Sequence, residues 1–355
     1  MMLQPRSIEA LAALVPEHPR LRVRGGGTKQ ALSSATAQTR TLDLSALAGI
    51  TEHTPEECTF TALAGTRIAD IDRALASHGQ YLPFDPPLAA AGATLGGTVA
   101  AGVNGSCRYR FGGIRDFLIG ARIVDGRGHV IHSGGKVVKN AAGFLLHQSL
   151  IGSCGTLGIL AELTFKVFPA AEARVTIRAD APDLAAAAAL MGALQRARFD
   201  FEAMDLEPPG TLQVRLGGFR DALPARLAAF ERVLGRGVCV DTGDEDEAIW
   251  RDAREFTWAP RGLPLVRVPI TPPGLLPLDT ALSRSGAVRR YTVAANLALI
   301  AWSEPLDTLA ALLRGMDLTG QVLLGPPGCP FIGAVRSNVF EERLRGVMDP
   351  DGRFA

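Results

Sequence analysis

The sequence predicts an α+β protein made of two domains and a short tail. Its 355 residues exceed what one small core requires, so two domains are the natural expectation. From residue 20 to about 170, short β-like runs alternate with glycine-rich turns, whereas beyond Pro169 strands and helices alternate. We therefore expect a first domain over residues 1–170, a small α+β domain over 171–335 and a helical tail over 336–355.

The first domain is expected to consist of strands and one clear amphipathic helix. Residues 21–24 and 58–63 are short apolar runs typical of strands. Residues 66–78 place Ile68, Ile71 and Leu75 on one helical face. A hairpin is predicted for 119–124 and 129–132 around the turn Asp-Gly-Arg-Gly, and a strand for 158–168, which Pro169 ends.

The second domain and the tail show a different pattern. We expect strands over 174–178 and 211–216, and helices over 184–197 and 223–234. The final stretch, 337–355, is predicted to be a helix that stops at the sequence Asp-Pro-Asp-Gly. No internal sequence repeat is apparent.

Composition excludes several classes of protein. Hydrophobic residues make up 47% of the chain and charged residues 21%, as in ordinary globular proteins, and the net charge of +1 gives no electrostatic case for binding nucleic acid or an anionic membrane. The five cysteines form no CxxC pair, so neither a disulfide framework nor a metal site is expected. The N-terminus resembles neither a signal peptide nor a membrane span, which favours a cytoplasmic location.

Three glycine-rich loops in the first domain indicate a ligand. They are RGGGTK at 24–29, GATLGGTVAAGVNG at 92–105 and GSCGTLG at 152–158. Glycines allow positive φ and close approach of main chain, and a nest of backbone N–H groups binds anions such as phosphate. The alternative interpretation is that the three loops are unrelated turns that share no ligand. Because none of the loops fits the Rossmann GxGxxG pattern or Walker A, the loops favour a dinucleotide bound in some other fold.

These motifs resemble a known family. RGGGTK, PFDPP at 83–87, the loop at 92–105, RFGGIRDFLIGARIVDGRGHVIHSGG at 110–135, KVVKNAAGFLLHQSLIGSCGTLGIL at 136–160 and TFKVFP are similar to the FAD-binding domain of the vanillyl-alcohol oxidase/p-cresol methylhydroxylase superfamily. Within it, the resemblance is to the E-type, FAD-binding subunits of bacterial glycolate oxidase. The resemblance implies an FAD domain of two α/β subdomains, a reduced α+β cap, and a tail that returns to the FAD domain.

The resemblance also implies site residues. One side of the FAD pyrophosphate would be held by Arg24, Gly25, Gly26, Gly27, Thr28 and Lys29, and the other by Thr94, Leu95, Gly96 and Gly97. Asn104 and Gly105 would lie toward the flavin, and Gly155, Gly158 and Ile159 would line the ribityl or adenine side. Some members attach flavin covalently through a histidine where this chain has Thr28, so non-covalent FAD is expected.

The catalytic residues of related hydroxy-acid dehydrogenases are not evident. In the enzymes that this family resemblance implies, the cap carries a histidine-rich metal motif. The last of the six histidines here is His147, before the expected cap, and the only tyrosine after it is Tyr291. A cap arginine is a candidate for binding the carboxylate of a substrate, although most arginines lie exposed on protein surfaces. The candidates are Arg251, Arg254, Arg267, Arg289 and Arg290. No catalytic residue and no metal site is assigned.

Three functional hypotheses follow from the resemblance. The first is an FAD-bearing subunit of a glycolate dehydrogenase complex, working with a catalytic D-type flavoprotein and an iron–sulfur F-type subunit, in the cytoplasm or peripheral to the inner membrane through those partners. The second is a self-sufficient FAD oxidoreductase for a small 2-hydroxy acid. The third is a scaffold whose FAD is structural. The missing cap histidines favour the first and third over the second.

Overall fold

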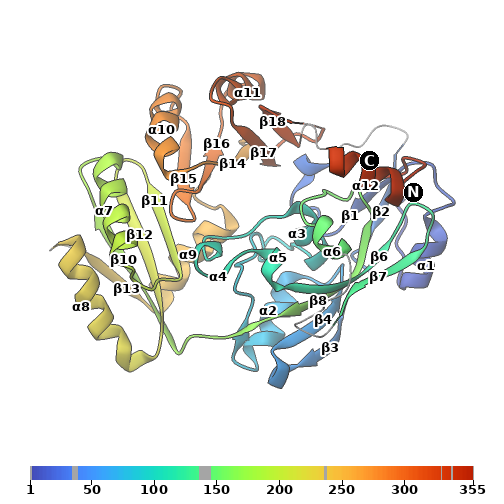
Figure 1. Ribbon diagram of the computed structural model, residues 1–355, viewed down its shortest axis with the longest axis horizontal. Helices are drawn as coiled ribbons and strands as arrows, with labels where there is room; N and C mark the ends of the chain where they lie inside the picture. The colour runs from blue at the N-terminus through green and yellow to red at the C-terminus, as the bar shows by residue number, and fades with distance from the viewer. Residues whose placement is uncertain are drawn as a thin grey trace.

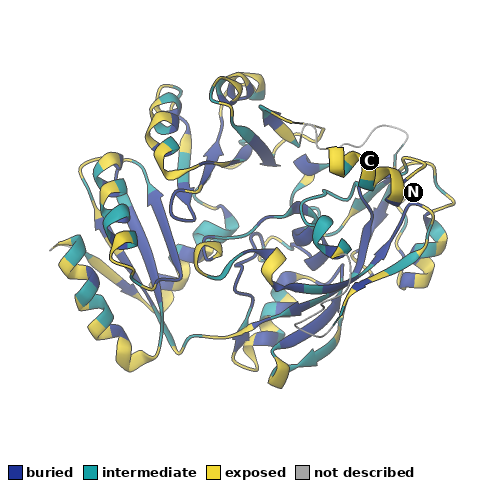
Figure 2. Cartoon of the chain, viewed as in Figure 1, coloured by how far each residue is buried: buried dark blue, intermediate teal, exposed yellow. Residues whose placement is uncertain are grey.

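The computed structural model describes residues 2–33, 39–135, 145–235, 238–328, 330–336 and 339–354. The KVVKNAAGF stretch at 136–144, which carried part of the family resemblance, lies outside these ranges. The described chain forms two halves side by side, each with its own sheet, and the N- and C-terminal ends lie close together on the same half (Figure 1). Buried residues concentrate in the sheets and on the helix faces turned toward them (Figure 2).

The first half is built around a five-stranded antiparallel sheet. Its order is β3 (Ile50–Thr54), β4 (Thr59–Leu63), β8 (Ile159–Lys166), β6 (Leu118–Val124) and β7 (Val130–Gly134). Two smaller pairs accompany it: parallel β1 (Leu21–Arg24) with β2 (Arg40–Asp43), and antiparallel β5 (Gln80–Tyr81) with β9 (Phe168–Pro169). The strands expected from the sequence and the 119–132 hairpin are confirmed, with ends shifted by a few residues.

Short helices connect these strands. They are α1 (Ile8–Leu14), α2 (Ile68–Ala76), α3 (Leu95–Ala101), α4 (Arg108–Phe111), α5 (Ile114–Phe117) and α6 (Leu146–Ser149), with 3-10 turns η1 (Gln30–Leu32) and η2 (Pro55–Glu57). The predicted apolar face of α2 is buried through Ile68, Ile71 and Leu75. Amphipathic spacing in the sequence therefore identified this helix correctly.

The second half is one nine-stranded antiparallel sheet. Its order is β13-β10-β12-β11-β15-β16-β14-β17-β18. The strands are β10 (Ala173–Asp180), β11 (Ala203–Glu207), β12 (Thr211–Gly218), β13 (Cys239–Thr242), β14 (Leu265–Pro269), β15 (Val288–Thr292), β16 (Leu297–Ala301), β17 (Thr319–Leu324) and β18 (Phe331–Gly333). Its helices are α7 (Leu184–Arg196), α8 (Leu223–Leu234), α9 (Asp244–Glu255), α10 (Leu275–Ser283) and α11 (Leu306–Gly315), with turns η3 (Arg220–Ala222) and η4 (Pro272–Gly274).

This sheet contains a structural duplication that the sequence does not display. Both β10-α7-β11-β12-α8-β13 and β14-α10-β15-β16-α11-β17 follow the order βαββαβ. Across the sheet, the first unit runs β13-β10-β12-β11 and the second runs β15-β16-β14-β17, so equivalent strands appear in reversed order. The two units join where β11 pairs with β15, at Leu206 and Tyr291. The expected strands and helices between 174 and 234 are confirmed. The strands and helices between residues 238 and 333 were not predicted.

The tail crosses back to the first half. Helix α12 (Val339–Met348) is followed by the predicted stop, and the Gly126 N–H donates to the Met348 carbonyl at 2.7 Å. The Leu21 N–H donates to the Arg353 carbonyl at 2.7 Å, and Phe354 forms a parallel bridge with Leu21. The end of the described chain is thus tied to β1, immediately before the first glycine loop.

The halves are joined by polar contacts that bury side chains from both. Ser106 donates to Asp205 at 2.6 Å, and the Gln321 side-chain amide donates to the Ala101 carbonyl at 3.3 Å. Arg254 in α9 donates to Asp85 at 3.2 Å. These bonds place β11, β17 and α9 of the second half against the end of α3 and the segments on either side of it in the first half.

Candidate cofactor site

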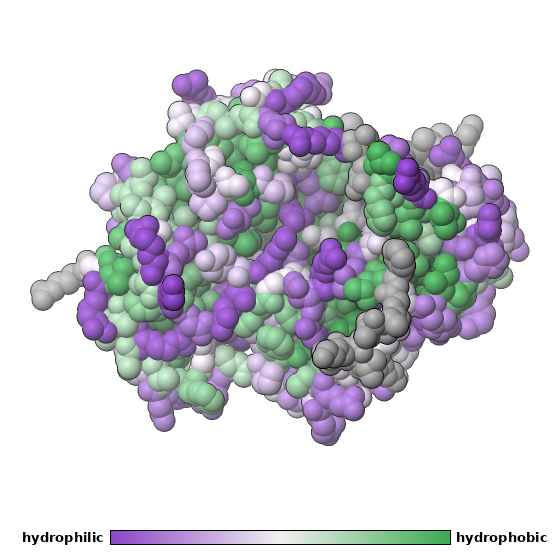
Figure 3. All heavy atoms as spheres, in the orientation of Figure 1, coloured by the Kyte–Doolittle hydropathy of each residue, from purple (hydrophilic) through white to green (hydrophobic). Residues whose placement is uncertain are grey.

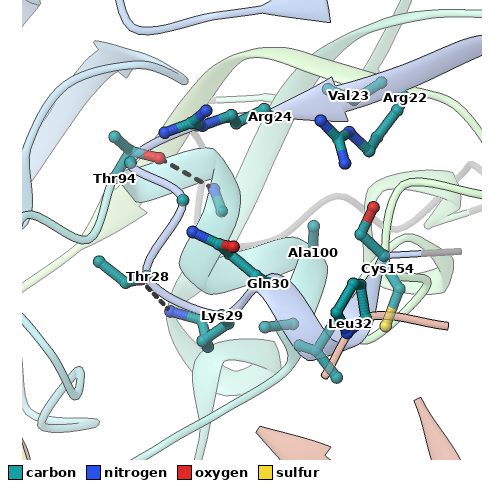
Figure 4. A pocket seen from close by; sticks show the side chains of 17 residues that line it. Arg22, Val23, Arg24, Thr28, Lys29, Gln30, Leu32, Thr94, Ala100 and Cys154 are labelled. Carbon is teal, nitrogen blue, oxygen red and sulfur yellow. Dashed lines mark hydrogen bonds between the residues drawn. The ribbon is translucent and has the colours of Figure 1, made fainter. Parts of the chain in front are cut away.

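A cavity of about 180 Å³ lies where the first glycine loop faces α3. Most of its lining comes from residues 22–30, which include all six positions of RGGGTK. Thr94 and Gly97 line the opposite side, and Pro327 reaches the cavity from the second half. Figure 4 shows Arg24 beside Thr94, with Lys29, Gln30 and Leu32 following the loop around the space.

The glycines of the first loop are required because two loops touch there. A Cβ on Gly25 would lie 2.1 Å from the Thr94 hydroxyl oxygen, and a Cβ on Gly26 would lie 1.9 Å from the Gly92 carbonyl oxygen. Gly27 has a φ of +68°, in the region that favours glycine. The glycine run therefore brings residues 25 and 26 directly onto the loop at 92–94.

This packing leaves donors at the cavity. Among the residues that the structure describes, the backbone N–H groups of Gly26, Gly27, Thr28 and Lys29 donate to no other group. Consecutive N–H groups of this kind form a nest that suits an anion. Unsatisfied donors are costly when they are screened from water, so a bound anion would stabilise this loop.

Lys29 adds a positive charge without a salt bridge. Its ammonium donates to the Thr28 hydroxyl at 3.2 Å, and no carboxylate in the described part of the chain forms an ion pair with it. Burial lowers the pKa of Lys29 to about 8, and the charge of Glu255 offsets only part of that effect. An anion beside the ammonium would remove this penalty, because an opposite charge favours the protonated form.

The start of α3 differs from the sequence-based expectation. The helix begins at Leu95 after the N-cap Thr94, whose hydroxyl accepts from the Gly97 N–H at 3.4 Å. The Leu95 N–H donates to the Thr66 carbonyl at 2.9 Å and the Gly96 N–H to the Ala64 carbonyl at 2.8 Å. These two amides are already used by the neighbouring loop, so they are not available to a ligand.

Leu95 and Gly96 are packing residues. Leu95 is fully buried, and a Cβ on Gly96 would lie 2.7 Å from the Cβ of Ala64. Neither residue lines the cavity that the structure shows, and their place at the pyrophosphate stays a prediction. Of the second glycine loop, only Thr94 and Gly97 line the cavity among the residues named from the sequence.

Asn104 and Gly105 lie beyond the cavity, at the junction of the halves. The Asn104 side-chain oxygen accepts from the Ile114 N–H at 2.8 Å, and Asn104 lines a cleft between the halves. A Cβ on Gly105 would lie 2.4 Å from the Asp85 carbonyl oxygen, so glycine is needed there for close packing.

The third glycine loop contributes through a residue that the sequence analysis did not select. Cys154 lines the cavity, whereas Gly155 faces Val23 and is not among the lining residues. Gly158 packs near Ile123, and Ile159 is fully buried in β8. None of these three residues lines the cavity that the structure shows, and their expected place along the cofactor stays a prediction.

Arg22 and Gln30 are further lining residues that were missed. Arg22 alternates with Arg24 along β1, and its guanidinium donates to Thr41 at 2.8 Å. The period of two in the run Leu-Arg-Val-Arg was the available signal, since residues two apart in a strand share a face.

The cavity lies beside a larger cleft between the halves, of about 640 Å³. Ala101 lines both spaces, and the cleft receives Asn104 and Ile114 from the first half. Arg267 and Gln321 enter the cleft from β14 and β17 of the second half. A ligand that extends from the glycine loops past the end of α3 would reach side chains from both halves.

The described residues include no group of three or more His, Cys, Asp or Glu side chains placed to hold a metal ion. Within the same ranges, no helix has the length and apolar character needed to span a membrane.

Comparison with known proteins identifies the ligand class. Residues 1–134 match the model of the family described as FAD binding domain. The first part of this chain is similar to FAD-binding domains. Its cofactor is accordingly FAD, as the motifs implied, and the second half is called the cap below.

Relatives with known names match over part of their length. The glycolate oxidase subunit GlcE of Escherichia coli (strain K12) is 37% identical over 171 residues, which cover 48% of this chain and 49% of that protein. The glycolate oxidase subunit GlcD of Bacillus subtilis (strain 168) is 35% identical over 139 residues, 39% of this chain and 29% of that protein. A D-lactate dehydrogenase of Archaeoglobus fulgidus is 32% identical over 149 residues, which cover 41% of this chain and 33% of that protein.

A solved structure of alkyldihydroxyacetonephosphate synthase shares the fold. It superposes with a TM-score of 0.71 at 14% identity, covering 99% of this chain and 74% of that one. Together with the mixed helix and sheet content, this confirms the predicted fold class: an FAD-binding domain followed by an α+β cap.

The residues at the cavity fit the charged part of FAD. Its pyrophosphate carries negative charge, and the free amides of residues 26–29 together with Lys29 provide donors and a compensating cation. Apolar lining from Val23, Leu32 and Ala100 borders the same space and suits the rings. When bound, FAD supplies one- and two-electron transfer.

Proposed function

We propose that this chain is the FAD-carrying subunit of a glycolate dehydrogenase-type complex. In this proposal FAD is held non-covalently, with its pyrophosphate on residues 24–29, Thr94 and Gly97. The subunit relays electrons from a catalytic D-type flavoprotein to an iron–sulfur F-type partner. The observation that carries the proposal is the nest of free backbone N–H groups beside Lys29, within a domain that matches FAD-binding proteins.

Non-covalent attachment is supported by the residue at the family's covalent position. Thr28 carries a hydroxyl that already accepts a hydrogen bond from Lys29 at 3.2 Å. A threonine hydroxyl is a weak nucleophile in the absence of an adjacent base. The loop is therefore suited to holding the cofactor by hydrogen bonds and charge.

Three of the five cap arginines named from the sequence are already paired with carboxylates, and the cap has no histidine, which argues against a self-sufficient active site of the usual kind. Arg254 pairs with Asp85 and Glu247, and Arg289 pairs with Asp279 at 2.6 Å. Arg290 contacts carboxylates of Glu207 and Asp252, each at 2.8 Å. These side chains are committed to ion pairs within the protein, and the sequence places no histidine in the cap to act as a base.

Exposed apolar side chains near the tail support a subunit role. Val335, Val339 and Val347 are 56%, 58% and 72% exposed. Hydrophobic atoms gather over the region of α12 in Figure 3. Apolar groups that cluster on a surface are typical of protein–protein contacts. The names of two relatives, GlcE and GlcD, describe subunits of glycolate oxidase.

The proposal predicts that the FAD-loaded chain alone does not oxidise glycolate. We expect no turnover with glycolate and an artificial electron acceptor, and flavin bleaching only after a D-type partner is added. Anaerobic stopped-flow absorbance at the flavin bands would follow the reduction. Turnover by the isolated chain would establish the self-sufficient enzyme instead. A flavin that stays oxidised while the assembled complex turns over would establish a structural cofactor.

A further inference from the structure

Arg267 is a partly buried cap arginine that forms no ion pair with a carboxylate of the described residues. It lies in β14 and lines the cleft between the FAD-binding domain and the cap. Its Nη1 donates to the Gly102 carbonyl at 3.0 Å and to the Gln321 side-chain oxygen at 3.1 Å. No acidic side chain in the described ranges forms an ion pair with it. A partly buried cation of this kind is costly unless an anion accompanies it.

The free edge of this guanidinium has the right shape for a carboxylate. The bonds to Gly102 and Gln321 both use Nη1. The edge formed by Nε and Nη2 has no partner among the described residues, and Nε is buried without a hydrogen bond. Two parallel N–H donors on one edge of arginine match the two oxygens of a carboxylate. Burial, together with the nearby positive charge of Arg108, lowers the pKa of Arg267 to about 10.

The surroundings add positive charge. Arg108 and Arg115, both exposed, line the same cleft from the FAD-binding domain. The one acidic residue that also lines it, Asp116, accepts the Gly113 N–H at 2.8 Å. Thr319 and Gln321 supply polar groups from β17. The cleft is therefore lined by three arginines and one carboxylate, and it shares Ala101 with the cofactor cavity.

We propose that Arg267, assisted by Arg108, binds the carboxylate of a small organic acid in the cleft next to the cofactor cavity. The proposal rests on the proposed function, because a 2-hydroxy acid or its 2-oxo product brings the required carboxylate. It extends that function by giving this chain its own acid-binding site, separate from the substrate site of a catalytic partner.

Equilibrium binding of unreactive acids tests the proposal. The FAD-loaded chain would be titrated with oxalate and with glyoxylate by isothermal titration calorimetry, and the FAD dissociation constant would be measured separately for each variant. We expect both acids to bind and Arg267→Gln to weaken binding about 10- to 100-fold, the range for loss of a charge-assisted pair. FAD affinity should stay unchanged.

Further variants separate acid binding from folding. Arg267→Lys keeps the charge but loses the planar fork, so it should bind the acids with intermediate affinity. Arg108→Gln alters an exposed side chain and should weaken binding several-fold without affecting the fold. Arg261→Gln, an exposed cap arginine away from the cleft, should behave like the wild type.

Three results would overturn the proposal. They are an FAD-loaded wild-type chain that binds neither acid, inorganic phosphate that binds as tightly as oxalate, and an Arg267→Gln chain that loses FAD affinity, which would assign Arg267 to the cofactor. A chain that takes up no FAD at all would instead reject the proposed function.

Discussion

Replacing Gly26 with alanine is expected to abolish measurable FAD binding. The new Cβ would lie 1.9 Å from the Gly92 carbonyl oxygen, and backbone on both sides of that contact must move apart. The movement separates the loop at 24–29 from Thr94 and disperses the free N–H groups that form the nest. We expect the FAD dissociation constant to rise by more than about 100-fold, since several charge-assisted bonds are lost together.

Quenching of FAD fluorescence during titration of the apoprotein would measure this effect. Gly315→Ala is the matched control, because a Cβ at Gly315 meets nothing within 4 Å. That control should bind FAD like the wild type. Wild-type affinity in the Gly26→Ala chain would show that the pyrophosphate is held elsewhere.

Replacing Lys29 with methionine is expected to weaken FAD binding about 10- to 100-fold. A hydrogen bond to a charged group contributes about 1.5–3 kcal/mol, which corresponds to this range. Methionine keeps much of the side-chain length, so packing of the loop should be preserved and the loss should report the charge. Fluorescence titration at pH 7 would measure it.

The affinity of the wild type should also fall as pH rises above 8. The pKa of Lys29 is lowered to about 8 in the absence of a ligand, so the ammonium is charged below this pH and neutral above it. An anion binds the charged form, and binding above pH 8 therefore requires uptake of a proton, which weakens affinity by up to about tenfold per pH unit. Arginine stays protonated throughout this range.

Titrations between pH 7 and 9.5 would resolve this linkage. The Lys29→Arg chain should keep its affinity across the range, and the Lys29→Met chain should show little pH dependence. An equal decline in the wild type and in Lys29→Met would assign the titration to a different group.

The sequence was most informative where local patterns decide structure. The alternation in 158–168, the apolar face of α2 and the turn in the 119–132 hairpin predicted their elements because those signals act over a few residues. RGGGTK indicated a ligand-binding loop only together with the other two glycine-rich loops, since a plain turn explains such a run equally well, and its residues line the cavity. Cys154 and Pro327 could not be predicted, because chain segments far apart in sequence bring them to the cavity.

The glycines illustrate the limit of sequence reasoning more directly. Gly26 and Gly96 look alike in sequence, yet Gly26 borders the cavity whereas Gly96 packs on Ala64. Both need the absence of a side chain, and only the tertiary neighbour distinguishes a ligand contact from core packing. In the same way, the cap duplication and the unpaired state of Arg267 depend on strand order and long-range partners.

The absorbance spectrum of the purified chain, recorded before and after acid precipitation, tests whether these loops hold FAD non-covalently. We expect flavin bands in the native protein, or after incubation with FAD, and we expect them to pass into the supernatant when the protein is precipitated. A yellow pellet would contradict non-covalent binding. A colourless protein that takes up no added FAD would contradict the claim that these loops hold the cofactor.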